Sequence, residues 1–95
     1  MQLRFTRRAE FDLEEIGDYI ARDNPRRAVT FVDEIIDHCQ KLLSFPQAAR
    51  LRSEFGQGVR LSVFRRRYLI FYVVEDEILE IRRIVHGARN LTDIV

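Results

Sequence analysis

The sequence predicts an α+β domain in which a helical hairpin packs across one face of an antiparallel sheet. Apolar residues recur at helical spacing over residues 7–22 and again over residues 25–44. Three apolar runs separated by charged turns then fill residues 59–85. With a short alternating segment at the start, the predicted order of elements is β-α-α-β-β-β. A chain of 95 residues is long enough for one core, so we expect a single domain over residues 1–95.

The first strand and the first helix are predicted from residues 2–22. Leu3 and Phe5 alternate with polar residues, as in a short strand. Thr6 has the side-chain oxygen that an N-cap requires. The apolar residues that follow are spaced four, three and four apart, namely Ala9, Leu13, Ile16 and Ile20. This spacing is typical of an amphipathic surface helix.

The second helix is predicted over residues 25–44. Asn24 is suited to its N-cap and Pro25 to its first turn, so the two helices should form an antiparallel hairpin. The apolar stripe of this helix is too wide for one contact, and we expect it to touch both the first helix and the sheet. Pro46 ends the helix, and residues 47–58 read as a loop.

Alternation over residues 59–64 predicts a strand that places its valines and Leu61 on the core and offers Arg60 to the other side. Residues 68–74 are apolar on both faces, which is typical of the central strand of a covered sheet. The last strand, residues 78–85, breaks strict alternation, which predicts a bulge or an exposed edge.

Charge is distributed unevenly along the chain. Residues 1–38 hold six arginines against nine acids, a net charge of −3, and residues 39–95 hold ten basic residues against six acids, a net charge of +4. Fifteen of the sixteen cations are arginine, whose planar fork binds carboxylates and phosphates in a bidentate manner. This pattern indicates charged partners, although a GC-rich genome would also enrich arginine.

The sequence does not indicate a membrane protein, a secreted protein or a metalloprotein. The longest apolar run, Leu69 to Val74, is far shorter than the roughly 20 residues that span a bilayer. The charged N-terminus is unlike a signal peptide, so we expect a cytoplasmic protein without a membrane association. One cysteine, Cys39, and two histidines show no metal-ligand spacing. We therefore expect no metal and no cofactor, and we interpret Cys39 as a buried apolar residue.

Nearly the whole chain resembles the RelE/ParE superfamily of small bacterial toxins from type II toxin–antitoxin systems. The segments that carry the resemblance are residues 9–16 with Tyr19, Asn24-Pro25 with Ala28, Phe45-Pro46, residues 58–60, residues 68–72 and residues 84–90. The last segment, IVHGARN, is similar to the ending of the ParE branch. Two departures are Asn90, where that ending has aspartate, and the three-arginine turn, where many ParE-like chains have a shorter or glycine-containing turn.

The RelE branch implies an mRNA endoribonuclease, and its residues are only partly present here. Its first basic position falls on Arg60, but the other two fall on Ser62 and Leu69, and no tyrosine follows Arg89. If the chain is a nuclease, the resemblance implies Arg60, His86 and Arg89 as catalytic residues. Histidine titrates near neutrality, yet before Gly87 a structural role at a strand end is the favoured interpretation of His86.

The ParE branch implies a toxin that inhibits DNA gyrase, with no covalent chemistry of its own, and that serves plasmid stabilisation. Under this hypothesis a basic surface contacts gyrase, DNA through gyrase, or both. Its candidate residues are Arg60, Arg65, Arg66, Arg67, Arg82, Arg83, His86 and Arg89.

The resemblance also implies a ParD-like antitoxin whose C-terminal segment folds on the toxin in a hetero-oligomer. Phe11, Tyr19 and Phe64 are candidate contacts because they are predicted to lie off the core stripes, and Arg60 and Arg82 are candidates for pairing with antitoxin carboxylates. A third hypothesis is a toxin fold that has lost its toxicity and acts as an inert binding module.

Overall fold

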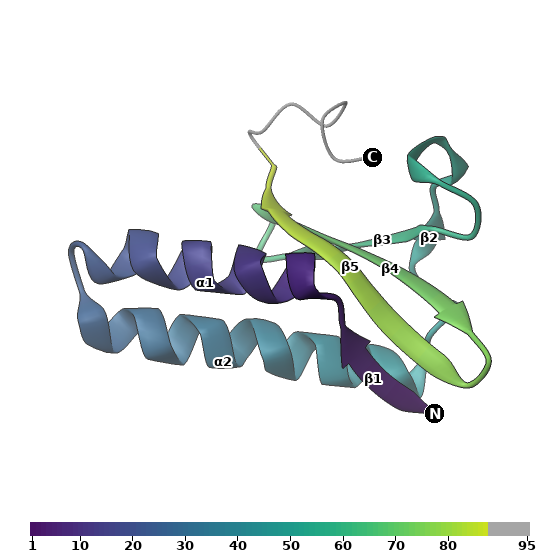
Figure 1. Cartoon of the computed structure of the whole chain (residues 1–95), viewed down its shortest axis with the longest axis horizontal. Coiled ribbons are helices and arrows are strands. Elements are labelled where there is room, and N and C mark those ends of the chain that lie inside the picture. Colours follow the sequence, from purple (N-terminus) through teal and green to yellow (C-terminus); the bar gives the residue numbers. More distant parts are fainter. Residues whose placement is uncertain (88–95) are drawn as a thin grey trace.

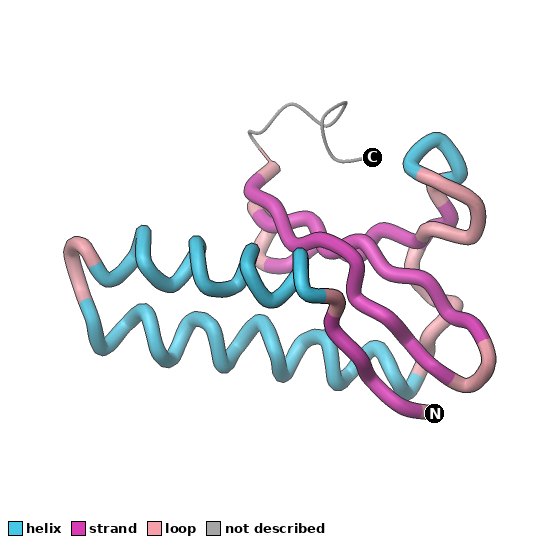
Figure 2. The backbone as a smooth tube through the Cα atoms, in the orientation of Figure 1, coloured by secondary structure: helices cyan, strands magenta, loops and turns pink. Residues whose placement is uncertain are grey.

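The computed structural model describes residues 1–87, in which two helices pack on a five-stranded sheet (Figure 1). The helices pair side by side on one face of the sheet, and the tip of their hairpin extends beyond the strands (Figure 2). The elements in chain order are β1 Gln2–Phe5, α1 Arg7–Ala21, α2 Pro25–Lys41, η1 Leu42–Ser44, β2 Arg50–Leu51, η2 Ser53–Phe55, β3 Arg60–Phe64, β4 Tyr68–Glu75 and β5 Ile78–His86. The predicted α+β class is confirmed.

The strand order is β1-β5-β4-β3-β2, which confirms β4 as the central strand. Two features depart from the predicted antiparallel sheet. β1 pairs in parallel with β5, with Gln2 opposite Ile78, and β2 forms inside the predicted loop, with Arg50 opposite Leu61. Alternation reports that a segment is extended but not which strand it pairs with, and a two-residue strand is too short to show alternation at all.

Both predicted helix caps are present. Thr6 Oγ1 accepts a hydrogen bond from the Ala9 amide at 3.0 Å, and Asn24 Oδ1 accepts one from the Arg27 amide at 3.1 Å. Pro25 occupies the first helical position, where its missing amide hydrogen costs no helical hydrogen bond. Thr6 therefore defines the start of α1, while Asn24 and Pro25 define the start of α2 and with it the turn of the antiparallel hairpin.

Each face of β4 contributes to a separate apolar cluster. On the helix side, Ile70 and Tyr72 are fully buried against α2 residues such as Ile35. On the other face, Phe71 lies in a smaller cluster partly covered by η2, whose Phe55 ring centroid is 5.0 Å from that of Phe71. The sheet is therefore covered by helices on one side and partly by a loop on the other, as predicted for this strand.

The predicted faces of β3 are partly right: Val59 and Leu61 lie in the smaller apolar cluster on the face opposite Arg60, but Val63 is 50% exposed and the helices cover the other face. Phe64 is only 7% exposed and packs edge-on against Phe31 of α2, while Ser62 Oγ lies 2.8 Å from His38 Nε2. Arg60 shares the parity of these residues and so also faces the helix side. Alternation defines the two faces of a strand but not which of them meets the helices. Here Val59 and Leu61 lie in the smaller cluster, on the face away from the helices. The expectation that Phe64 lies off the core is overturned by the same geometry.

β5 contains the predicted bulge. Phe71 pairs with Arg83 and Tyr72 pairs with Ile81, which leaves Arg82 as the extra residue. The alternative prediction, an exposed edge, is wrong because β5 lies between β1 and β4. Among the described helices, none is long and apolar enough to cross a membrane.

Cys39 is predicted to be chemically inert in the folded protein. Its side chain is 0% exposed, and burial raises the pKa of the thiol to about 12. Because the thiolate is the nucleophile, we expect an aromatic disulfide reagent at pH 8 to label the folded protein at a rate limited by its unfolding. The urea-unfolded chain is the control and should react as a free thiol; equally fast labelling of the folded chain would contradict the prediction.

Candidate functional site

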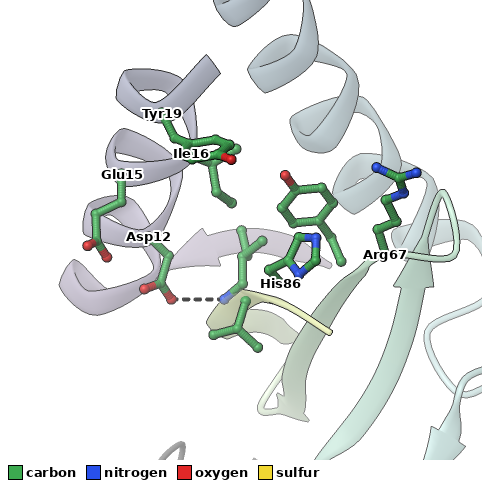
Figure 3. Close-up of a pocket in the computed structure, with 9 residues that line it drawn as sticks. Asp12, Glu15, Ile16, Tyr19, Arg67 and His86 are labelled. Carbon is green, nitrogen blue, oxygen red and sulfur yellow. Dashed lines mark hydrogen bonds between the residues drawn. The ribbon is translucent and has the colours of Figure 1, made fainter. Parts of the chain in front are cut away.

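A cleft of about 430 Å³ opens between α1 and the ends of β4 and β5 (Figure 3). Tyr19 and Ile16 lie on the helical wall, and His86 and Arg67 lie on the opposite wall. The remaining lining residues are Asp12, Glu15, Tyr68, Ile84 and Val85. The cleft is thus bounded by aromatic and aliphatic side chains with charged groups at both walls.

The position of α1 follows from the short length of β1. β1 pairs with β5 only as far as Ile81, so the remainder of β5 would have an unpaired edge. Thr6 Oγ1 donates a hydrogen bond to the Arg82 carbonyl at 3.1 Å, and Asp12 Oδ2 accepts one from the Ile84 amide at 2.9 Å. Side chains of the first helical turns therefore satisfy the backbone groups that a longer β1 would have paired.

Asp12 also holds Arg83. The carboxylate is 2% exposed and accepts from Arg83 Nε at 2.9 Å and Nη2 at 3.3 Å, while Arg8 Nε lies 3.5 Å from Oδ1. The Arg83 side chain is only 13% exposed. The prediction that Arg83 lies on an exposed basic surface is therefore wrong, because its guanidinium is needed to balance a buried carboxylate.

Arg60, which was predicted to lie on the basic binding surface, has a structural role. Its Nη1 donates to the carbonyls of Gln47 and Ala49 at 3.2 and 2.8 Å. The hydroxyl of the neighbouring Tyr72 donates to the Pro46 carbonyl at 2.7 Å, and burial raises the pKa of this tyrosine. Together the two side chains anchor the segment that connects α2 to β2.

The three-arginine turn joins β3 to β4. Arg65 and Arg66 have φ angles of 51° and 61°, and the Arg67 amide donates to the Phe64 carbonyl at 3.2 Å. These values describe a type I′ turn, which normally contains Asn-Gly. Arg65 Nη2 donates to Glu34 Oε1 at 2.5 Å, so α2 holds this side of the turn.

Glu34 receives a second arginine from its own helix. Arg27 Nη1 donates to Oε2 at 2.6 Å, and this hydrogen bond, together with the charges of Arg27 and Arg65, lowers the pKa of the carboxyl. Within residues 1–87, the exposed side chains of Arg66 and Arg67 make no such ion pair. The turn therefore has one anchored arginine and two that face solvent.

His86 lies at the end of β5 beside the same turn. Its ring centroid is 5.3 Å from that of Tyr68 in an edge-on contact, and the following Gly87 amide donates to the Arg67 carbonyl at 2.6 Å. A Cβ atom at Gly87 would lie 3.1 Å from that carbonyl oxygen, which accounts for the glycine. The structure thus brings His86 and Arg67 together.

The remaining predicted basic residues lie apart from this group. The exposed Arg82 donates from Nε to Glu80 at 2.8 Å, and Glu80 also binds Arg4 of β1. Arg89 lies outside the described residues. The candidate residues within 1–87 are therefore not gathered on one surface, since the partly buried side chains of Arg60 and Arg83 are bound to main-chain carbonyls and to Asp12.

Phe11 and Tyr19 lie off the core, as predicted. They are 46% and 69% exposed on α1, respectively. The guanidinium of Arg8 lies 5.1 Å from the Phe11 ring centroid, and that of Arg22 lies 5.9 Å from the Tyr19 ring centroid.

The roles of Asp12 and Tyr68 in the cleft were not predicted from the sequence. Asp12 follows Ala9 and precedes Ile16 at helical spacing, which is a signal for a buried acid.

Similarity to known proteins was found at the level of a family and of a fold. A family model described as "ParE toxin of type II toxin-antitoxin system, parDE" matches residues 3–91. A solved structure from the "Chromosomal ParDE TA system from P. aeruginosa" is 27% identical, covers 90% of this chain and 95% of its own, and superimposes with a TM-score of 0.78. Among curated proteins, none matches the sequence.

Proposed function

The chain belongs to the ParE toxin family of type II toxin–antitoxin systems, and from this premise we propose that it inhibits DNA gyrase and is neutralised by a ParD-like antitoxin. The family match over residues 3–91 carries the proposal. The fold shared with a chain of a ParDE system supports it. In a cytoplasmic setting, such a toxin arrests replication when the antitoxin is lost, which is the basis of plasmid stabilisation.

The contacts of Arg60 favour a binding mechanism over RNA cleavage. In a RelE-like nuclease this position would supply a cation to the scissile phosphate. Here the guanidinium is oriented toward the Gln47 and Ala49 carbonyls, and the other two positions, Ser62 and Leu69, carry no charge. We therefore assign the toxin an action through contact with its target rather than through an active site.

The exposed arginines of the β3–β4 turn are the proposed target contact. Arg66 and Arg67 are exposed, and the Arg65–Glu34 pair holds the turn against α2. Because the turn is already held, less entropy is lost when its exposed guanidinium groups bind a carboxylate or a phosphate. Arg82, which lies with Glu80 and Arg4 near β1, is assigned to a separate contact with antitoxin carboxylates.

We expect the purified toxin to inhibit supercoiling by gyrase, and the double variant Arg66→Gln/Arg67→Gln to require roughly ten times more protein for the same inhibition. Both substitutions remove charge from an exposed turn without a core contact. Inhibition is measured as the toxin concentration that halves supercoiled product. Arg50→Gln is the matched control because Arg50 is also an exposed arginine, and it lies in β2, paired with Leu61 near the opposite end of β3 from the turn.

Induced expression without antitoxin separates the three hypotheses. Growth arrest with filamentation, an SOS response and gyrase-linked DNA breaks supports the gyrase proposal. Rapid translation arrest with cut transcripts would replace it with the nuclease, and folded protein without any phenotype would replace it with the inert binding module. Absence of supercoiling inhibition at a large molar excess over gyrase would also overturn it.

A further inference from the structure

We propose that the cleft between α1 and the β4–β5 end binds one unpaired nucleotide of a single-stranded nucleic acid. The base would lie between Tyr19 and Tyr68, and the phosphate would lie at Arg67. The inference rests on the proposed function in one respect, since DNA cleaved and held by gyrase would supply the strand. The proposed site would let the toxin contact nucleic acid directly, in addition to its proposed contact with gyrase.

The two tyrosines supply aromatic surface at opposite walls of the cleft. Tyr19 extends from α1 and is 69% exposed, and Figure 3 shows it across the opening from His86. Tyr68 lies on the sheet wall in contact with His86. The Tyr68 hydroxyl is a hydrogen-bond donor at neutral pH, as in any tyrosine, and burial raises its pKa further. Stacking on aromatic rings is the main sequence-independent attraction for unpaired bases.

The cationic side of the cleft lies on a turn that is held from two sides. Arg67 lines the cleft, and its carbonyl is fixed by the Gly87 amide at 2.6 Å. The Arg65–Glu34 pair anchors the turn from the other side. Arg67 therefore presents its guanidinium group to the cleft from a held backbone, an arrangement suited to phosphate oxygens.

The opposite wall determines which anion is favoured. Asp12 is already balanced by Arg83, but Glu15 is exposed on α1 at the rim of the cleft. An acidic peptide along the cleft would place carboxylates near Glu15 as well as near the arginines. A nucleotide places its negative charge on one side and its uncharged base on the other, which matches the two walls. A cleft of about 430 Å³ is in the size range of small-ligand sites rather than of duplex grooves.

The test is fluorescence anisotropy with labelled hexanucleotides of DNA and of RNA, using the full chain purified without antitoxin. We expect both oligonucleotides to bind. Arg67→Gln should weaken binding and reduce the slope of log affinity against log salt by about 0.7. Tyr19→Ala should weaken binding about tenfold with the slope unchanged, because stacking releases no counterions, and Tyr19→Phe should restore it. Glu15→Gln should strengthen binding, and Arg50→Gln should change nothing.

Tighter binding of RNA than of DNA would identify a ribose contact as part of the site, and tighter binding of DNA would favour cleaved DNA as the source. The proposal is overturned if neither oligonucleotide binds, if Tyr19→Ala leaves both affinities unchanged, or if an acidic hexapeptide binds equally well. Gyrase inhibition by the same preparation separates the two proposals. Inhibition without oligonucleotide binding rejects the nucleotide site alone, and oligonucleotide binding without inhibition rejects the gyrase target alone.

Discussion

Asp12→Ala is expected to lower the free energy of unfolding by about 3–5 kcal/mol, the range typical of removing one partner of a buried ion pair. The substitution leaves the Arg83 guanidinium, 13% exposed, without its carboxylate. It also leaves the Ile84 amide without its hydrogen-bond acceptor, which adds the cost of an unsatisfied buried donor. Urea denaturation followed by circular dichroism measures the change.

Glu14→Ala is the matched control for Asp12→Ala. Glu14 is an exposed carboxylate on the same helix, and its removal should change stability by less than about 0.5 kcal/mol. Asp12→Ala/Arg83→Met should be more stable than Asp12→Ala alone, because an apolar side chain leaves no unbalanced charge. A loss below about 1 kcal/mol for Asp12→Ala would contradict the role assigned to the pair.

The helical part of the fold could be predicted because its signals are local. Thr6 and Asn24 precede their helices with the side-chain oxygens that caps need, and helical periodicity spans enough residues to be unambiguous. The sheet was less predictable, since pairing joins segments that are distant in the chain. The parallel contact of β1 with β5, 76 residues apart at Gln2 and Ile78, has no local signature.

The site was predicted less well than the fold, and arginine is the reason. An arginine that binds main-chain carbonyls, as Arg60 does, looks the same in a sequence as one that faces solvent. Arg83 was assigned to the surface because its partner, Asp12, is 71 residues away. The aromatic residues of α1 were easier to place, since Phe11 and Tyr19 fall outside the apolar stripe and are exposed.

The arginines of this chain therefore divide into two groups with different consequences for mutation. Arg60 and Arg83 make partly buried hydrogen bonds that hold loops and α1 in place, so their loss should reduce stability and affect every activity together. Arg66 and Arg67 are exposed on a held turn, so their loss should weaken binding without reducing stability. A variant that separates stability from toxicity is expected only in the second group.

Replacing both Phe11 and Tyr19 by alanine is expected to weaken binding to a ParD-like antitoxin by a hundredfold or more, because exposed aromatic residues at an interface commonly contribute about 2 kcal/mol each when truncated. Both rings are substantially exposed on α1, so the fold should remain intact, which thermal unfolding checks. Isothermal titration with an antitoxin that suppresses toxicity on co-expression measures the affinity.

Val29→Ala tests whether the expected loss of antitoxin affinity is specific to the α1 aromatic residues. Val29 is an apolar residue that is 64% exposed on α2, so its truncation removes a similar kind of surface outside the proposed contact. Equal losses for Val29→Ala and for the double variant would indicate a diffuse apolar interface. An unchanged affinity for the double variant with an intact fold would instead place the antitoxin away from α1, leaving Tyr19 and its cleft accessible in the complex.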